Sequence, residues 1–120
     1  MSFINELEGY KTRFKNLHWS AQNDAIHVRI DELSSELASF QDEVAEVIQG
    51  VYGQFGPNVL SGTTVSQSNP LDALKGLQMS VTNFHKTISS KQDLVGLLAS
   101  VETFMTTLNK YTYLFKISLR

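Results

Sequence analysis

The feature that most constrains this chain is a long run of apolar residues spaced alternately by four and three positions. Its members are Ile26, Ile30, Leu33, Leu37, Phe40, Val44, Val47 and Val51. This alternation places every member on one face of an α-helix and forms a seam that packs against other helices. The sequence therefore predicts one long helix from about Ala25 to Tyr52, with Asn23 or Asp24 as its N-cap.

Three further amphipathic helices are expected. They span about Ser2 to Ser20, about Pro70 to Ser89 and about Lys91 to Leu119. Asn69-Pro70 is a strong start signal for the third helix, and Ser90 to Asp93 resembles a capping box for the last. The side chains expected to be buried in these helices are Phe3, Leu7, Tyr10, Phe14, Leu17, Leu74, Leu77, Val81, Phe84, Ile88, Leu94, Leu97, Leu98, Val101, Met105, Leu108 and Phe115. Four helices on one core, without an alternating strand pattern, predict an all-α four-helix bundle.

The segment between the second and third helices is rich in turn-forming residues. It includes Gly53, Gly56-Pro57, Ser61-Gly62 and the run Thr63 to Asn69. A connection of about fifteen residues lets the chain cross the length of a bundle, or holds a short helical turn, before the next helix starts. Because the chain has 120 residues, residues 1–120 are expected to form one domain.

Composition and charge exclude several classes of protein. A hydrophobic fraction of 42% with 18% charged residues fits a folded, soluble protein. The net charge is −2 without a cluster of Lys or Arg, so DNA binding is not expected. The absence of cysteine excludes disulfides, thiolate zinc sites and cysteine nucleophiles. The start of the chain has no signal-peptide pattern and no apolar run approaches about 18 residues, so the expected location is the cytoplasm, without membrane contact.

Metal-competent side chains recur on the long helix in two pairs. His27 and Asp31 are four residues apart, as are Asp42 and Glu46, and His18 lies just upstream. Side chains at i and i+4 share a helix face, and the spacing between the pairs keeps all four on roughly one face. The pair centres are ~22 Å apart along a straight helix at ~1.5 Å per residue, so they cannot meet within one chain. Two copies crossing antiparallel near the middle of this helix would create two identical sites.

Each of these residues has a plainer interpretation when it is taken alone. Exposed carboxylates often only solvate a helix, and those expected to do so are Glu32, Glu36 and Glu43. His18 taken alone could simply interact with the last carbonyls of its helix. Trp19 taken alone is more typical of a core or loop anchor. His85 has no carboxylate at i±4 and is expected to be structural or exposed. The combination favours a metal, because imidazole and carboxylate without thiolate suit iron, manganese or zinc. An open, oxygen-rich set favours Fe(II) oxidation over structural zinc.

The segment Lys15-Asn16-Leu17-His18-Trp19-Ser20 and the spacing His27-x3-Asp31-x10-Asp42-x3-Glu46 occur together here. They resemble the Lys-Asn-aromatic-His-Trp signature and the ferroxidase motif of the Dps proteins, which are miniferritins of the ferritin-like superfamily. The residues from Asp93 onward are similar to the final helix of that family. The resemblance is sharp over about residues 14–53 and weaker over 70–119.

The resemblance implies a ferritin-like bundle that assembles through twofold dimers into a hollow dodecameric shell. It implies an iron-binding ferroxidase site between subunits, formed by His18, His27 and Asp31 of one subunit and by Asp42 and Glu46 of its twofold mate. Peroxide, or oxygen, would oxidise Fe(II) there, and the shell would store ferric mineral and protect against oxidative stress. Trp19 would lie beside the site and intercept radicals. The alternative is a Dps-like structural or assembly protein, for example of a virion, without significant ferroxidase turnover.

Overall fold

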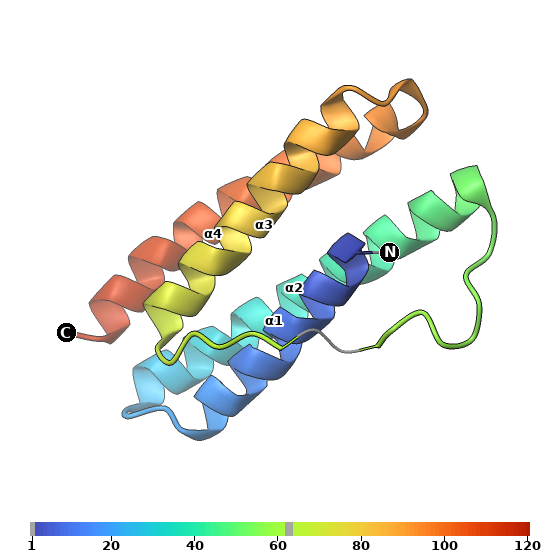
Figure 1. Cartoon of the computed structure of the whole chain (residues 1–120). Helices are drawn as coiled ribbons and strands as arrows, with labels where there is room; N and C mark the ends of the chain where they lie inside the picture. Colours follow the sequence, from blue (N-terminus) through green and yellow to red (C-terminus); the bar gives the residue numbers. More distant parts are fainter. Residues whose placement is uncertain (1, 62–63) are drawn as a thin grey trace.

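The structure describes residues 2–61 and 64–120, which contain four long helices and one short 3₁₀ helix. In this computed structural model the elements are α1 (Ser2–Trp19), α2 (Asp24–Tyr52), α3 (Pro70–Ser89), η1 (Gln92–Leu97) and α4 (Leu98–Ser118). The four α-helices pack into one bundle (Figure 1). The fold class predicted from the apolar periodicity is therefore confirmed.

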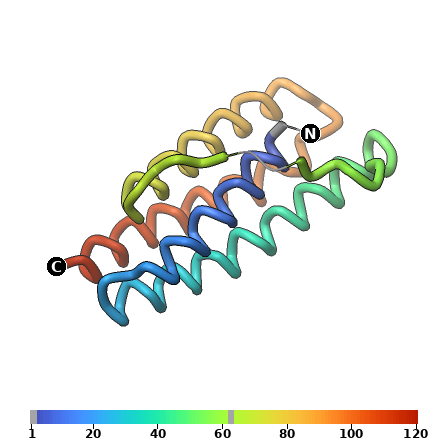
Figure 2. The backbone as a smooth tube through the Cα atoms, turned by 60° about the horizontal axis from the view of Figure 1, so that its bottom comes forward, coloured from blue at the N-terminus to red at the C-terminus, as the bar shows by residue number. Residues whose placement is uncertain are grey.

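Every pair of neighbouring helices in the bundle is antiparallel. Helix α1 packs against α2 and α3, and α4 packs against the same two helices from the other side. The described residues of the connection, 53–61 and 64–69, return along α1 from the end of α2 to the start of α3 (Figures 1 and 2). Asn5 Nδ2 donates to the carbonyl of Val59 (3.1 Å) and Arg13 Nε to that of Val65 (2.8 Å), which attaches the connection to α1. The predicted crossover is confirmed, whereas the alternative of a helical turn is not found in its described residues.

Side-chain caps set the starts of α2 and α3. The Oδ1 atom of Asn23 accepts from the backbone N–H of Ile26 at 2.9 Å, and that of Asn69 accepts from Asp72 at the same distance. These bonds satisfy N–H groups that have no partner within the helix. Both predicted caps are confirmed. Helix α2 ends at Tyr52, and the C-cap residue Gly53 has a φ of 101°, which favours glycine.

The apolar seam of α2 follows the predicted pattern from Ile26 as far as Val44 and then departs from it. Ile48 is 1% exposed and takes the next buried position, whereas Val47 and Val51 are 37% and 41% exposed. The prediction was therefore wrong at these two valines. A helix has 3.6 residues per turn, so a strict four-three alternation drifts by ~20° per heptad around a straight helix. By the end of α2 the drift has moved the pattern off the buried face.

The start of the last helix also differs from the prediction. The Ser90 hydroxyl donates to the carbonyl of Thr87 (3.0 Å) and Ser90 is the C-cap of α3, so it does not form a capping box with Asp93. The chain instead forms η1, and α4 begins only at Leu98. The buried aromatic residues Phe104 and Tyr111 were not predicted. Leu98 and Met105, which were expected to be buried, lie at the edge of the core rather than inside it.

Aromatic pairs join the two halves of the core. Phe3 of α1 stacks on Phe84 of α3 with ring centroids 4.0 Å apart, and Phe40 of α2 stacks on Phe104 of α4 at 4.1 Å. Such pairs add to the stabilisation from area burial alone. Most of the large apolar side chains are buried in this core. No helix in the described residues is both long and apolar enough to cross a membrane.

Candidate metal centre

The turn between α1 and α2 brings His18 and His27 face to face. His18 lies in the last turn of α1 and His27 near the start of α2. Asn23, the N-cap of α2, also donates from Nδ2 to the carbonyl of Ser118 (3.1 Å), which fixes the turn to the end of α4. The two imidazole rings stack with centroids 3.8 Å apart and planes 18° apart.

Each of these rings is held by the backbone of the other residue. His18 Nδ1 lies 2.9 Å from the carbonyl oxygen of His27, and His27 Nδ1 lies 2.8 Å from the carbonyl oxygen of His18. A carbonyl oxygen only accepts hydrogen bonds, so each Nδ1 carries a proton and donates it. In the neutral rings the lone pair is therefore on Nε2. Metal-binding histidines commonly have this arrangement, with the other ring N–H donated to a carbonyl or carboxylate.

The stacked geometry limits how the two rings can bind metal. A metal ion binds imidazole nitrogen in the plane of the ring, at about 2.0–2.1 Å for zinc. Planes that stack at 3.8 Å with an angle of 18° do not meet within such a distance. The Nε2 atoms of His18 and His27 therefore cannot hold the same ion in this conformation. Either each ring binds its own ion, or one ring leaves the stack.

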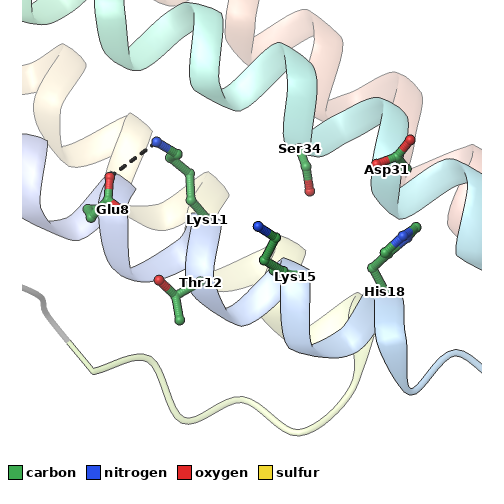
Figure 3. Close-up of a pocket in the computed structure, with 7 residues that line it drawn as sticks. All are labelled: Glu8, Lys11, Thr12, Lys15, His18, Asp31 and Ser34. Carbon is green, nitrogen blue, oxygen red and sulfur yellow. Dashed lines mark hydrogen bonds and ion pairs between the residues drawn. The ribbon is translucent and has the colours of Figure 1, made fainter.

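Asp31 lies one turn along α2 from His27 and shares a pocket with His18 (Figure 3). The pocket lies between α1 and α2 and has a volume of 330 Å³. Its lining residues are Glu8, Lys11, Thr12, Lys15, His18, Asp31 and Ser34. The carboxylate of Asp31 is exposed and makes no hydrogen bond or ion pair with the described residues. We call His18, His27 and Asp31 the imidazole half-site.

The other two predicted ligands, Asp42 and Glu46, lie farther along α2. Both are exposed, and their carboxylates have no partner in the described part of the chain; we call them the carboxylate half-site. Helix α2 is continuous, so ~22 Å separates the His27–Asp31 pair from this half-site. Across residues 2–61 and 64–120, no three His, Cys, Asp or Glu side chains gather closely enough to hold a metal ion. One chain thus contains two separate sets of candidate ligands.

Trp19 lies on the surface next to the imidazole half-site. Its side chain is 69% exposed, so it does not anchor the core of the chain. Its ring lies 5.8 Å from the ammonium nitrogen of Lys15, a distance at which a cation is attracted to an indole face.

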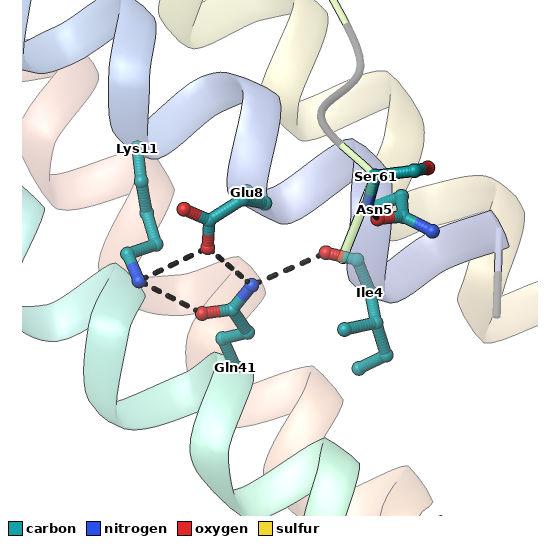
Figure 4. A network of polar contacts seen from close by, with 6 residues as sticks. All are labelled: Ile4, Asn5, Glu8, Lys11, Gln41 and Ser61. Atoms are coloured by element: carbon teal, nitrogen blue, oxygen red, sulfur yellow. Dashed lines mark hydrogen bonds and ion pairs between the residues drawn. The ribbon is translucent and has the colours of Figure 1, made fainter. Parts of the chain in front are cut away.

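A buried polar network around Gln41 was not predicted, and two of its members, Glu8 and Lys11, also line the pocket. Gln41 is 5% exposed; its amide donates to the carbonyl of Ile4 (3.2 Å) and to Glu8 (3.1 Å), and it accepts from Lys11 (3.0 Å) (Figure 4). Burial raises the pKa of the Glu8 carboxyl, but the hydrogen bonds from Gln41 and Lys11 and the charge of Lys11 outweigh it, so the pKa lies below its usual 4.5. The sequence around Gln41 does not indicate that its amide is buried, because all of its hydrogen-bond partners lie on α1.

Two charged side chains have partners that were not identified from the sequence. His85 does have a carboxylate partner, Glu102, at 3.0 Å, but that residue lies on α4 rather than at i±4. Glu32 does more than solvate α2, since it pairs with Arg29 at 3.0 Å and accepts a hydrogen bond from the Tyr111 hydroxyl at 3.5 Å. The other two carboxylates of that group are exposed, as expected.

Comparisons with known proteins add no relative. No protein-family model matches the sequence, and neither a curated protein nor a solved structure matches it. The assignment of the two half-sites therefore depends on the spacing, tautomers and exposure of their own residues.

Proposed function

We propose that this protein is a Dps-type miniferritin, which binds Fe(II), oxidises it and stores the ferric product inside a shell of identical subunits. The observation that carries the proposal is the reciprocal locking of His18 and His27. It leaves two Nε2 lone pairs available to metal near the carboxylate of Asp31, which has no partner among the described residues. A four-helix bundle with a single long crossover, the connectivity of ferritin-like proteins, supports the same function.

A second copy of the chain would complete the ligand set. Between Asp31 and Asp42, the same face of α2 carries only small side chains, Ser35 and Ala38, so two α2 helices could approach closely there. If they cross antiparallel about a twofold axis, the imidazole half-site of each copy meets the carboxylate half-site of the other. The exposed carboxylates of Asp42 and Glu46, which have no partner among residues 2–61 and 64–120, would then gain one.

The ligand types fit the oxidation of iron. Neutral imidazole nitrogen accepts Fe(II), and carboxylate oxygens favour the harder Fe(III) product. One hydrogen peroxide takes one electron from each of two Fe(II) ions, its O–O bond breaks, and two Fe(III) and two hydroxide ions result. Two rings that each bind their own ion suit this stoichiometry. Trp19, exposed beside His18, is placed to reduce radicals that escape.

The proposal is tested by loading purified protein with Fe(II) without oxygen and then adding peroxide. Absorbance of the ferric product and particle size are recorded together. We expect protein-dependent oxidation and a ferric core inside a shell-sized particle. Asp42→Ala and Glu46→Ala should each abolish this oxidation, because each removes part of the carboxylate half-site. Glu43→Ala, an exposed neighbour outside the ligand face, is the matched control and should oxidise iron normally.

Two results would contradict the proposal. Oxidation that is unchanged in both carboxylate variants would exclude the site. An assembled particle that gives no oxidation above a buffer control would favour the structural alternative, a bundle that builds an assembly without iron turnover.

A further inference from the structure

The pocket beside the imidazole half-site contains a cation and a hydroxyl that both lack an acceptor among the described residues. Lys15 forms no ion pair with the described residues, and its contact is with the ring of Trp19. The Ser34 hydroxyl oxygen is buried and has no hydrogen-bond partner in the part of the chain that the structure describes. The two side chains extend from α1 and α2 into the space between these helices (Figure 3). Because a buried donor without a partner is costly, the Ser34 hydroxyl favours an occupant that accepts from it, and the exposed Lys15 ammonium can donate to the same occupant.

The other lysine of this pocket is already satisfied. Lys11 contacts Glu8 at 3.2 Å and Gln41 at 3.0 Å, so its charge and the charge of Glu8 offset each other. Lys15 is thus the cation of the pocket that has no carboxylate partner among the described residues. An anion bound near Lys15 would gain its charge without displacing an existing ion pair.

We propose that this pocket binds a small tetrahedral oxyanion, with inorganic phosphate as its simplest form, held by Lys15 and Ser34. The volume of 330 Å³ is ample for such an ion. Asp31 lines the same pocket, and its carboxylate can accept a hydrogen bond from an oxyanion that carries a proton. Phosphate carries such a proton at neutral pH and sulfate does not, so the site selects phosphate over sulfate. The site does not depend on iron, and it stands or fails separately from the ferroxidase function.

The test uses the full chain after metal has been removed with a chelator, at constant ionic strength. Phosphate is titrated, and the line width of its phosphorus NMR signal is measured together with the fluorescence of Trp19, the single tryptophan. We expect saturable broadening and a matching change in fluorescence as the Lys15 ammonium leaves the indole ring for the anion. Sulfate should bind at least about tenfold more weakly, since it loses the hydrogen bond to Asp31.

Variants separate a built site from general attraction of anions. By the NMR signal, Lys15→Gln should weaken phosphate binding by at least about tenfold and Ser34→Ala by several-fold. Lys86→Gln, an exposed lysine of α3 that does not line the pocket, should bind phosphate normally. Circular dichroism checks that each variant is folded.

Three outcomes would overturn the proposal. Equal binding of sulfate and phosphate, or equal loss in Lys86→Gln, would mean an adventitious ion only. No phosphate binding by the folded protein would mean that water alone occupies the pocket. A Trp19 signal that follows protein concentration and ignores phosphate would give Lys15 a different partner, a carboxylate of a second copy.

Discussion

Which face of α2 is buried beyond Val44 can be tested with two neighbouring residues. Ile48 is 1% exposed and Val47 is 37% exposed. Ile48→Ala removes three carbon groups from the core, worth about 2.4 kcal/mol at ~0.8 kcal/mol each, and the cavity raises the loss to about 3–4 kcal/mol. Val47→Ala removes little buried surface and improves helix propensity, so its net effect should stay within about 0.5 kcal/mol.

Urea unfolding followed by circular dichroism measures both free energies. The experiment is run at two protein concentrations, because the stability of an oligomer depends on concentration. We expect Ile48→Ala to lower the midpoint with an unchanged slope and Val47→Ala to leave both nearly as they are. Equal losses, or a larger loss for Val47→Ala, would refute the burial assigned to this part of α2. A Val47→Ala loss that grows with concentration would instead indicate a contact between copies.

Three further perturbations follow from local geometry. Gly50→Ala should raise the melting temperature and the free energy of unfolding by about 0.5–1 kcal/mol, because a Cβ at this position meets nothing within 4 Å. Gly76→Ala should lower the melting temperature, because its Cβ would clash with the Tyr10 hydroxyl. The opposite order of the two melting temperatures would contradict the packing. Asn69→Ala should cost about 1 kcal/mol in urea unfolding by removing the cap of α3, and no loss would argue against that cap. The lowered pKa of Glu8 contributes stability above pH 4.5 that is lost as the pH falls through the folded-state pKa; Glu8→Gln should flatten this part of the stability profile, by no more than about 1 kcal/mol, and an unchanged profile would exclude the effect.

The sequence was sufficient wherever a local rule decides the structure. The bounds of α3 agree with the prediction, Pro70–Ser89, because a capping Asn followed by Pro fixes its start within a few residues. Apolar spacing likewise identified most of the core. It failed beyond Val44, where the small difference between 3.5 and 3.6 residues per turn accumulates. It also failed at Ser90, whose hydroxyl bonds back to α3 instead of capping the next helix.

The candidate site was only partly predictable. Spacing singled out His18 and His27 as candidate ligands, a prediction that stays untested, whereas their stacking and their bonds to each other's carbonyls depend on the path of the turn between them. Gln41 could not be recognised, because burial of its amide is possible only with partners from α1. The partner of His85 could not be recognised for the same reason, because Glu102 lies on another helix. Contacts between helices that are distant in the sequence determine these features, and the local spacing of residues does not reveal such contacts.

The central claim, that two copies share each iron site, is tested most directly by mixing two inactive variants. One lacks His27 and Asp31, and the other lacks Asp42 and Glu46. In a mixed dimer one site loses both half-sites while the other site is intact, so random assembly restores about a quarter of the wild-type sites. We predict that each variant alone fails to oxidise Fe(II) and that the co-assembled mixture regains about this fraction of the activity. No recovery in a verified mixed dimer, or full activity of either variant alone, would contradict the shared site.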